Sequence, residues 1–494
     1  MRSPRSWGRC DVLGSLFWSF MEQGGSRVAQ LLVQLVLARL LAPDAFGLMA
    51  ILLVFVNVAD SVAQSGMGTA LIQREGADDD DYSTALWLSL ALALAMYVVI
   101  FFAAPAIEAF YAMDSLATPL RAISLTFVLN SVNSIQRSHL QRHMDFRGLC
   151  KANVLAIAGS GVIGIAAALA GLGVWALVVQ YVSQAALTCV TLLRFSPWRP
   201  ALVFRARSAR ELYSYGWKIC VTSILGTVYT SVSELILGRV CSSAELGLYS
   251  QGRKWPNAAI QLFSNALQNV FLPRFASLQS DAAGLRAAMR RMLIDGSFLV
   301  VPLSFLTAVA SGPIVGLLLG PSWAGCAPIF GLTCLGNVVL ILQIVNLRAY
   351  MALGRSDLYL GLQAVKVLVG GVVLAAAAVV TRDIAMVAAA NLAVTLFNVT
   401  VVDLWPATSV HGYGRAEQLG DIAPILLVSM AAAACASPLL LLDAPAAVIL
   451  LLQVIVFAAA FLLIVRLFGL EGASDVHRAL GGILRALRER ARRR

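Results

Sequence analysis

The 494-residue chain carries little charge. Only 13% of its residues are Asp, Glu, Lys or Arg, 59% are hydrophobic, and its mean hydropathy is +0.81. These values lie outside the range of soluble domains, so the sequence predicts an all-α polytopic membrane protein. The net charge of +11 is attributed to membrane topology, because the Lys and Arg residues are not gathered on one soluble domain. No nucleic-acid partner is therefore expected.

Several motifs of enzymes and metalloproteins are missing. The sequence has no GxxxxGK[ST] loop, so ATP is not expected to be the direct energy source. No catalytic triad or carboxylate pair stands out, and the predicted aqueous loops are too short for an active site. The eight cysteines include no CxxC pair, and they are interpreted as small packed hydrophobic residues. His139 and His143 have the spacing of a metal pair but only Asp145 nearby, so no metal or cofactor is expected.

The stretch from Asp11 to Glu75 contains an apolar run that carries polar side chains. Residues 12–41 are apolar and long enough to cross a hydrocarbon core of roughly 30 Å, yet they contain charged and amide side chains. Four of these recur at i, i+4, i+7 and i+11, namely Gln23, Arg27, Gln30 and Gln34. They share one helical face, which is expected to look toward protein or water and not toward lipid.

A second copy of this stretch follows two hundred residues later. Leu35–Leu48 aligns without a gap to Leu235–Leu248, and the matches include Arg39 with Arg239 and Gly47 with Gly247. The same offset places a second polar set, Ser223, Thr227, Thr230 and Glu234, opposite the first. Shared leucine-rich composition is the alternative explanation. Repeated bundles with a site between them are typical of transporters.

Apolar runs of membrane length predict about fourteen transmembrane helices. The repeat begins after six of them, so it is expected to be a parallel repeat of two six-helix bundles followed by two C-terminal helices. The predicted divisions are a first bundle at 1–196, a basic connector at 197–211, a second bundle at 212–406, helices 13 and 14 at 421–468, and a basic amphipathic tail at 474–494.

The distribution of basic residues predicts the orientation. Most of the 37 Lys and Arg residues fall in the terminal tails and in alternate loops, which places both termini in the cytoplasm. The acidic loop GADDDDYS, at residues 76–83, lies on this basic side. It is interpreted either as a solvated loop or as a partner of a neighbouring basic loop.

Ionisable residues inside predicted spans are the candidates for function, because their insertion is costly unless they have a partner or a wet cavity. Five are basic: Arg27, Arg253, Lys366, Lys218 and Lys254. Three are acidic and are candidates for ion coupling: Glu22, Asp60 and Glu234. The predicted polar lining consists of Gln23, Gln30, Gln34, Asn57, Asn257 and Gln261. The excess of bases predicts a cationic cavity for an anionic substrate. Pairing between helices is the alternative, and Lys218 can also snorkel.

The motifs LARLLAPDAFGL, GMGTALIQRE, LGLYSQGRKWPN and PRFASLQSD resemble the Wzx-type polysaccharide-biosynthesis flippases over about residues 7–466. Their superfamily also includes multidrug exporters and lipid-linked peptidoglycan-precursor flippases. The resemblance implies a bacterial inner-membrane protein that flips an undecaprenyl-pyrophosphate-linked oligosaccharide to the outer leaflet by alternating access. It also implies a cationic cavity, for which Arg27, Arg253 and Lys366 are the candidates. GRKWPN departs from the expected pattern by its two adjacent bases, which puts the role of Lys254 in doubt.

The resemblance thus predicts a transporter and not an enzyme. Expected partners are the lipid-linked oligosaccharide, the bilayer, H⁺ or Na⁺ as a coupling ion, and a polysaccharide polymerase or glycosyltransferases. A multidrug exporter, a membrane-embedded glycosyltransferase or polysaccharide polymerase, and a scaffold remain alternatives. A drug exporter would have an acid-rich cavity, and a polymerase would have a large outer loop.

Overall fold

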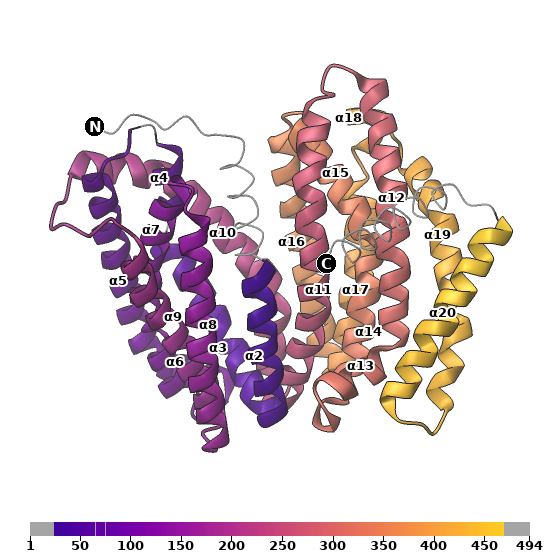
Figure 1. Ribbon diagram of the computed structural model, residues 1–494, viewed down its shortest axis with the longest axis horizontal. Helices are drawn as coiled ribbons and strands as arrows, with labels where there is room; N and C mark the ends of the chain where they lie inside the picture. The colour runs from indigo at the N-terminus through magenta and orange to yellow at the C-terminus, as the bar shows by residue number, and fades with distance from the viewer. Residues whose placement is uncertain (1–23, 65, 75, 469–494) are drawn as a thin grey trace, which may run out of the picture. The chain divides into compact units, whose positions relative to one another are not determined.

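The computed structural model describes residues 24–64, 66–74 and 76–468, and its chain divides into two compact units, Met1–Ser250 and Gln251–Arg494. Every regular element of the described residues is a helix, as the ribbon in Figure 1 shows. Ten helical segments in this part are long and apolar enough to cross a membrane. The predicted all-α polytopic fold is confirmed, while the count of fourteen spans and the predicted domain bounds stay predictions.

The first unit consists of the helices from α2 to α10 and the first turns of α11. Their bounds are α2 (Ser26–Leu40), α3 (Pro43–Gln64), α4 (Met67–Gln73), α5 (Asp79–Tyr111), α6 (Ala117–Ile123), α7 (Thr126–Arg142), α8 (Phe146–Leu169), α9 (Val174–Phe195), α10 (Ala206–Val240) and α11 (Ser243–Ala276). The longest of these, α10, begins inside the segment predicted to be a connector, and it packs against α3, α4 and α5.

The sequence predicts one continuous transmembrane helix over residues 45–70, but the structure divides this segment into α3 and α4. The division falls at Gly66, whose φ of 64° is a left-handed conformation that ends a helix and that glycine adopts at little cost. After the break, α4 packs against α7. Gly68 allows this approach, because an added Cβ at this position would lie 2.5 Å from Ser138 Oγ.

A close crossing joins α3 to the first turn of α11. An added Cβ on Gly47 would lie 1.7 Å from the carbonyl oxygen of Ser243, and one on Gly247 would lie 1.9 Å from the carbonyl oxygen of Pro43. Only glycine fits at such distances, so both residues are required by the contact. The two contacts are reciprocal, because the offset of two hundred residues equates Gly47 with Gly247 and Pro43 with Ser243. This local two-fold relation agrees with the repeat seen in the sequence.

The second unit holds the rest of α11 and the remaining helices. Their bounds are α12 (Ala282–Val309), α13 (Ser311–Leu318), η2 (Pro321–Trp323), α14 (Cys326–Gly336), η3 (Asn337–Val339), α15 (Leu340–Ala352), α16 (Ser356–Thr381), α17 (Ile384–Phe397), η4 (Asn398–Asp403), α18 (Ala407–His411), α19 (Arg415–Ala436), η5 (Ser437–Leu441) and α20 (Ala446–Phe468). One of these, η4, is a π-helix, a form that often marks functional positions.

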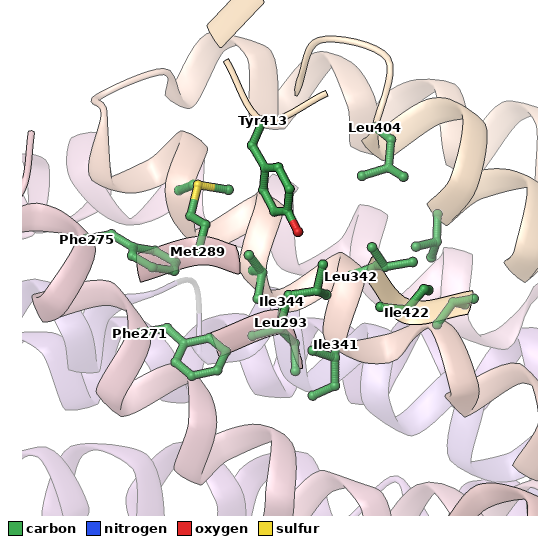
Figure 2. Close-up of a cluster of buried hydrophobic side chains, with 14 of the residues drawn as sticks. Phe271, Phe275, Met289, Leu293, Ile341, Leu342, Ile344, Leu404, Tyr413 and Ile422 are labelled. Atoms are coloured by element: carbon green, nitrogen blue, oxygen red, sulfur yellow. The ribbon is translucent and has the colours of Figure 1, made fainter. Parts of the chain in front are cut away.

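The main hydrophobic core of the second unit lies where α12 and α15 meet α11 and α19 (Figure 2). Leu285, Met289 and Leu293 recur every four residues and therefore fall on one face of α12. They pack with Val345 of α15 and with Ile422 of α19. Large apolar side chains on other helix faces are exposed, as lipid contact requires of a membrane protein.

A buried polar network lies beside this core and joins α15, α18 and α19. The Nε2 atom of His411 lies 3.2 Å from Asn346 Oδ1, and the amide N–H of Tyr413 donates to His411 Nδ1 at 3.3 Å. Gln418 completes the network through its side-chain amide, which bonds to Asn346. Because Nδ1 accepts a hydrogen bond, this arrangement suits a neutral ring with its proton on Nε2.

Acidification is expected to weaken this network. Burial lowers the pKa of His411 to about 4, below the 6.5 of a free side chain. Between these values the unfolded chain binds the extra proton, so the stability from the neutral ring is complete above pH 6.5 and is lost as pH falls toward 4. At pH 5 the loss should be about 2 kcal/mol. Melting temperatures of the wild type and of His411→Gln, measured from pH 7 to 5, should diverge. Parallel curves would show that His411 does not titrate in this way.

Candidate functional site

A polar cavity of about 570 Å³ lies within the first unit. Its described lining residues come from α3, α4, α7, α10 and the break between α3 and α4. They are Asn57, Asp60, Ser61, Gln64, Gly66, Gly68, Ile72, Ser134, Arg137, Ser138, Gln141, Ser223, Thr227, Thr230 and Ser231. Of the helices that line this cavity, α3 is long and apolar enough to cross a membrane, and polar residues in such a helix are expected to face a cavity or protein and not lipid.

Hydroxyl and amide groups dominate this lining. Ile72 is its one large apolar residue, Arg137 its one cation and Asp60 its one carboxylate among the described residues. The Nη2 atom of Arg137 donates to Asn153 Oδ1 at 3.0 Å, and this contact with α8 fixes the guanidinium on one side. The formal charge of the described lining is therefore balanced.

The two carboxylate oxygens of Asp60 differ in their hydrogen bonding. Its Oδ2 accepts a hydrogen bond of 2.8 Å from the side-chain amide of Asn130 on α7, while its buried Oδ1 has no hydrogen-bond partner in the described part of the chain. A buried carboxylate oxygen without a donor is unfavourable unless a proton or a cation reaches it. Asp60 can therefore take part in ion binding.

The structure brings several residues of the predicted polar faces into this cavity. Asn57 and Asp60 lie there, as do Ser61 and Gln64, which continue the same polar stripe of α3. Of the set found on α10 through the repeat, Ser223, Thr227 and Thr230 also line it. Glu234 lies further along α10 and is half-buried.

Other predicted residues of the first unit lie elsewhere. Arg27 is exposed on α2, and Gln34 is buried. The side-chain amides of Gln30 and Gln184 hydrogen-bond each other at 3.4 Å, which joins α2 to α9. The described cavity lining does not include Arg27, Gln30 or Gln34, and the roles of these three residues stay predictions. Glu22, Gln23 and the side chain of Lys218 lie outside the described residues.

In the second unit the predicted cation Lys366 forms a buried ion pair. Its Nζ lies 2.9 Å and 3.1 Å from the two carboxylate oxygens of Asp403, and both side chains are at most 3% exposed. Tyr350 Oη donates to the backbone carbonyl of Asp403 at 2.7 Å. The pairing between helices considered for the intramembrane charges is thus observed for Lys366. Arg253 and Lys254 are half-buried on α11, and Asn257 and Gln261 are exposed on the same helix.

Sequence reasoning missed Arg137, Asn130 and Asp403. The signal for the first two was present, because Asn130, Ser134, Arg137 and Gln141 recur at helical spacing along α7. Asp403 lies near the end of a predicted span, and only the fold shows that it meets Lys366.

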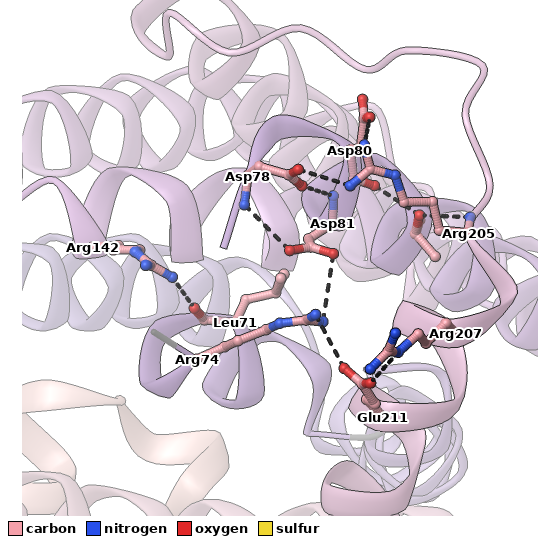
Figure 3. Close-up of polar contacts among 10 residues, drawn as sticks. Leu71, Arg74, Asp78, Asp80, Asp81, Arg142, Arg205, Arg207 and Glu211 are labelled. Carbon is pink, nitrogen blue, oxygen red and sulfur yellow. Dashed lines mark hydrogen bonds and ion pairs between the residues drawn. The ribbon is translucent and has the colours of Figure 1, made fainter. Parts of the chain in front are cut away.

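The acidic loop after α4 forms ion pairs with the basic connector (Figure 3). Of the two interpretations of the acidic loop, the pairing with a neighbouring basic loop is therefore confirmed. Arg205 pairs with Asp80 and, at 2.7 Å, with Asp78, while Arg74 bridges Asp81 and Glu211. Partial burial raises the pKa of Asp78, but hydrogen bonds from the Asp81 N–H and from Arg205 outweigh it, so the pKa is lower than usual. These residues form the connector clasp, which fixes the start of α10.

The ten described helical segments that are long and apolar enough to cross a membrane define a polytopic α-helical membrane protein. The solved structure of the lipid II flippase MurJ in an inward closed conformation matches 92% of this chain and 98% of its own, with a TM-score of 0.71 at 13% identity. An inward-facing multidrug resistance MATE family transporter of the MOP superfamily matches 77% of this chain and 94% of its own, with a TM-score of 0.60 at 15% identity. These likenesses concern the fold.

The chain belongs to the family of polysaccharide biosynthesis proteins, whose family model matches residues 36–328. The resemblance noted from the sequence is thereby confirmed. Similar proteins include the succinoglycan biosynthesis transport protein ExoT of Rhizobium meliloti (strain 1021), 24% identical over 67% of this chain and 67% of its own. The lipopolysaccharide biosynthesis protein WzxC of Escherichia coli (strain K12) is 24% identical over 61% of this chain and 62% of its own. The chain thus spans about two thirds of these relatives' lengths.

Proposed function

We propose that the chain is a flippase that moves an undecaprenyl-pyrophosphate-linked oligosaccharide from the inner to the outer leaflet of the bacterial plasma membrane. The family supports a role in polysaccharide biosynthesis, and the likeness to MurJ supports a fold that can serve a lipid-linked substrate. The observation that carries the proposal is the polar cavity, because a headgroup needs polar partners within the membrane while its polyprenyl tail stays in lipid.

The proposed mechanism is alternating access. The headgroup enters a polar cavity from the inner leaflet, and rearrangement of the helical bundles then exposes it to the outer leaflet. Arg27, Arg253 and Lys254 remain candidates for contacts with the pyrophosphate, because a guanidinium or ammonium group pairs well with phosphate oxygens. Lys366 can join them only if its pair with Asp403 opens.

The sidedness of the lipid-linked oligosaccharide in cells tests this function. Cells that lack the gene should accumulate the intermediate on the cytoplasmic leaflet, and the wild-type gene should restore its exposure outside. Equal exposure with and without the gene would exclude the flippase. If the oligosaccharide reaches the outer leaflet but stays unpolymerised without the gene, the chain is a polymerase.

Asp60 is proposed as the ion-coupling residue, because its Oδ1 atom is buried without a donor beside the cavity. Asp60→Asn preserves the size of the side chain and removes its charge. In proteoliposomes the variant should lose the response of translocation to an imposed proton or sodium gradient, while the wild type keeps it. Asp357→Asn, at an exposed carboxylate paired with Arg355, is the matched control and should respond as the wild type does. A normal response of Asp60→Asn would refute this role.

A further inference from the structure

The chemistry of the described cavity lining differs from that of an anion site. Ten of its side chains are neutral hydroxyls or amides, against one arginine and one aspartate of opposite charge. A pyrophosphate carries more than one negative charge and needs an excess of cations or backbone donors. A saccharide has many neutral hydroxyls, each of which both donates and accepts hydrogen bonds. The neutral hydrogen-bonding groups of the lining therefore match the hydroxyl groups of a saccharide.

The orientation of the hydroxyl groups strengthens this match. Ser61 Oγ donates to the carbonyl of Asn57 at 2.8 Å, and Ser138 Oγ donates to the carbonyl of Ser134 at 2.9 Å. Thr230 Oγ1 likewise donates to the carbonyls of Gly226 and Thr227, at 3.1 and 3.0 Å. Each of these three hydroxyls therefore uses its single O–H on its own helix and keeps lone pairs as acceptors. These hydroxyl oxygens can accept hydrogen bonds from O–H donors, which a sugar supplies and an ionised phosphate lacks.

The amides and the arginine provide the complementary donors. Asn57 and Gln64 of α3 and Gln141 of α7 carry amide groups at the cavity, and Arg137 adds a guanidinium, which also donates to Asn153. The volume of about 570 Å³ falls within the roughly 300–1,000 Å³ typical of sites for small ligands. The helices α3 and α7 thus supply both donors and acceptors to one space, and α10 supplies further acceptors.

We infer that this cavity binds the saccharide part of the lipid-linked substrate through neutral hydrogen bonds and that the pyrophosphate is held elsewhere. The inference rests on the proposed function and specifies which part of the substrate the first unit recognises. Acceptors on α3, α7 and α10 and donors on α3 and α7 then select the sugar by its hydroxyl pattern. Affinity in the cavity should therefore survive removal of the lipid pyrophosphate.

The test uses the free oligosaccharide, which mild acid releases from the polyprenyl-linked intermediate that accumulates in cells without the gene. Calorimetry and saturation-transfer NMR measure its binding to the full-length protein in nanodiscs. The wild type should bind it. Thr230→Val and Gln64→Leu should each weaken binding about two- to tenfold, because each removes a hydrogen-bonding group. Thr307→Val is the matched control, because Thr307 makes the same helical bond, to the carbonyl of Leu303, outside the cavity.

The possible outcomes separate this inference from the proposed function. If cells without the gene accumulate no intermediate on the inner leaflet, the proposed function and the saccharide assignment fall together. If the intermediate accumulates but the wild type binds only polyprenyl pyrophosphate and not the free oligosaccharide, the saccharide assignment alone is wrong. If the oligosaccharide binds and both cavity variants bind it as tightly as Thr307→Val, the saccharide site is not this cavity. Melting temperatures equal to that of the wild type establish that the variants are folded.

Discussion

Gly47→Ala is expected to destabilise the protein, although it adds a single methyl group to a helix. The methyl carbon would lie 1.7 Å from the carbonyl oxygen of Ser243, and this backbone atom cannot rotate away as a side chain can. The helices α3 and α11 must separate, at a cost of about 1–3 kcal/mol or more. Gly247→Ala should behave alike, since its methyl would meet the carbonyl of Pro43 at 1.9 Å. The melting temperature of the purified protein measures the effect.

Two comparisons sharpen this prediction. Gly371→Ala is the control, because Gly371 lies within α16 with no neighbouring atom within 4 Å of an added Cβ, and alanine there should leave stability unchanged or raise it. The double variant at Gly47 and Gly247 should lose less stability than the sum of the single losses, because one separation of the helices relieves both clashes. Additive losses, or a Gly47→Ala protein as stable as the wild type, would show that the crossing is absent.

Removal of Lys366 is expected to have an effect of similar or larger size. Lys366→Met leaves the carboxylate of Asp403 buried without its counter-ion, which typically costs about 3–5 kcal/mol. Asp403→Asn should destabilise less, and Lys366→Met combined with Asp403→Leu should recover most of the loss, because a well-packed apolar pair can replace a buried ion pair. Thermal or denaturant unfolding in detergent measures all three variants.

An exposed ion pair close by in the sequence provides the control. Arg355 Nε lies 3.3 Å from Asp357 Oδ1, and the two side chains are 50% and 70% exposed. Arg355→Ala should therefore cost less than about 1 kcal/mol. A loss for Lys366→Met no greater than that for Arg355→Ala would mean that Lys366 and Asp403 are hydrated and not paired in the membrane.

Much of the fold was predictable because the membrane simplifies the sequence pattern. Runs of apolar residues locate the helices, since backbone groups in lipid must be paired within the segment. Local irregularities were harder to predict. The break at Gly66 lies inside a predicted span, where glycine is tolerated in a helix, and only the packing of α4 against α7 shows the need for it.

The candidate site was predicted in part, and the reason lies in what periodicity can show. Spacing placed Asn57, Ser61 and Gln64 on one face of α3, and the repeat extended the polar pattern to Thr227 and Thr230 of α10. Periodicity says that a face is polar, but not which helix it meets. For this reason the sequence did not distinguish Gln30, which bonds to Gln184, from Asn57, which lines the cavity. Partners such as Lys366 and Asp403 are likewise found only in three dimensions.

The arginines of the connector clasp have one role during membrane insertion and another in the folded protein. In the predicted orientation, Arg74 and Arg205 are among the basic residues that keep their loops in the cytoplasm while the chain enters the membrane. Acidic residues in the same loops contribute little to that step. In the folded protein the same charges are neutralised by Asp78, Asp80 and Asp81. Because Arg205 follows Asp78 by 127 residues, their pair can form only after the helices between them have been synthesised.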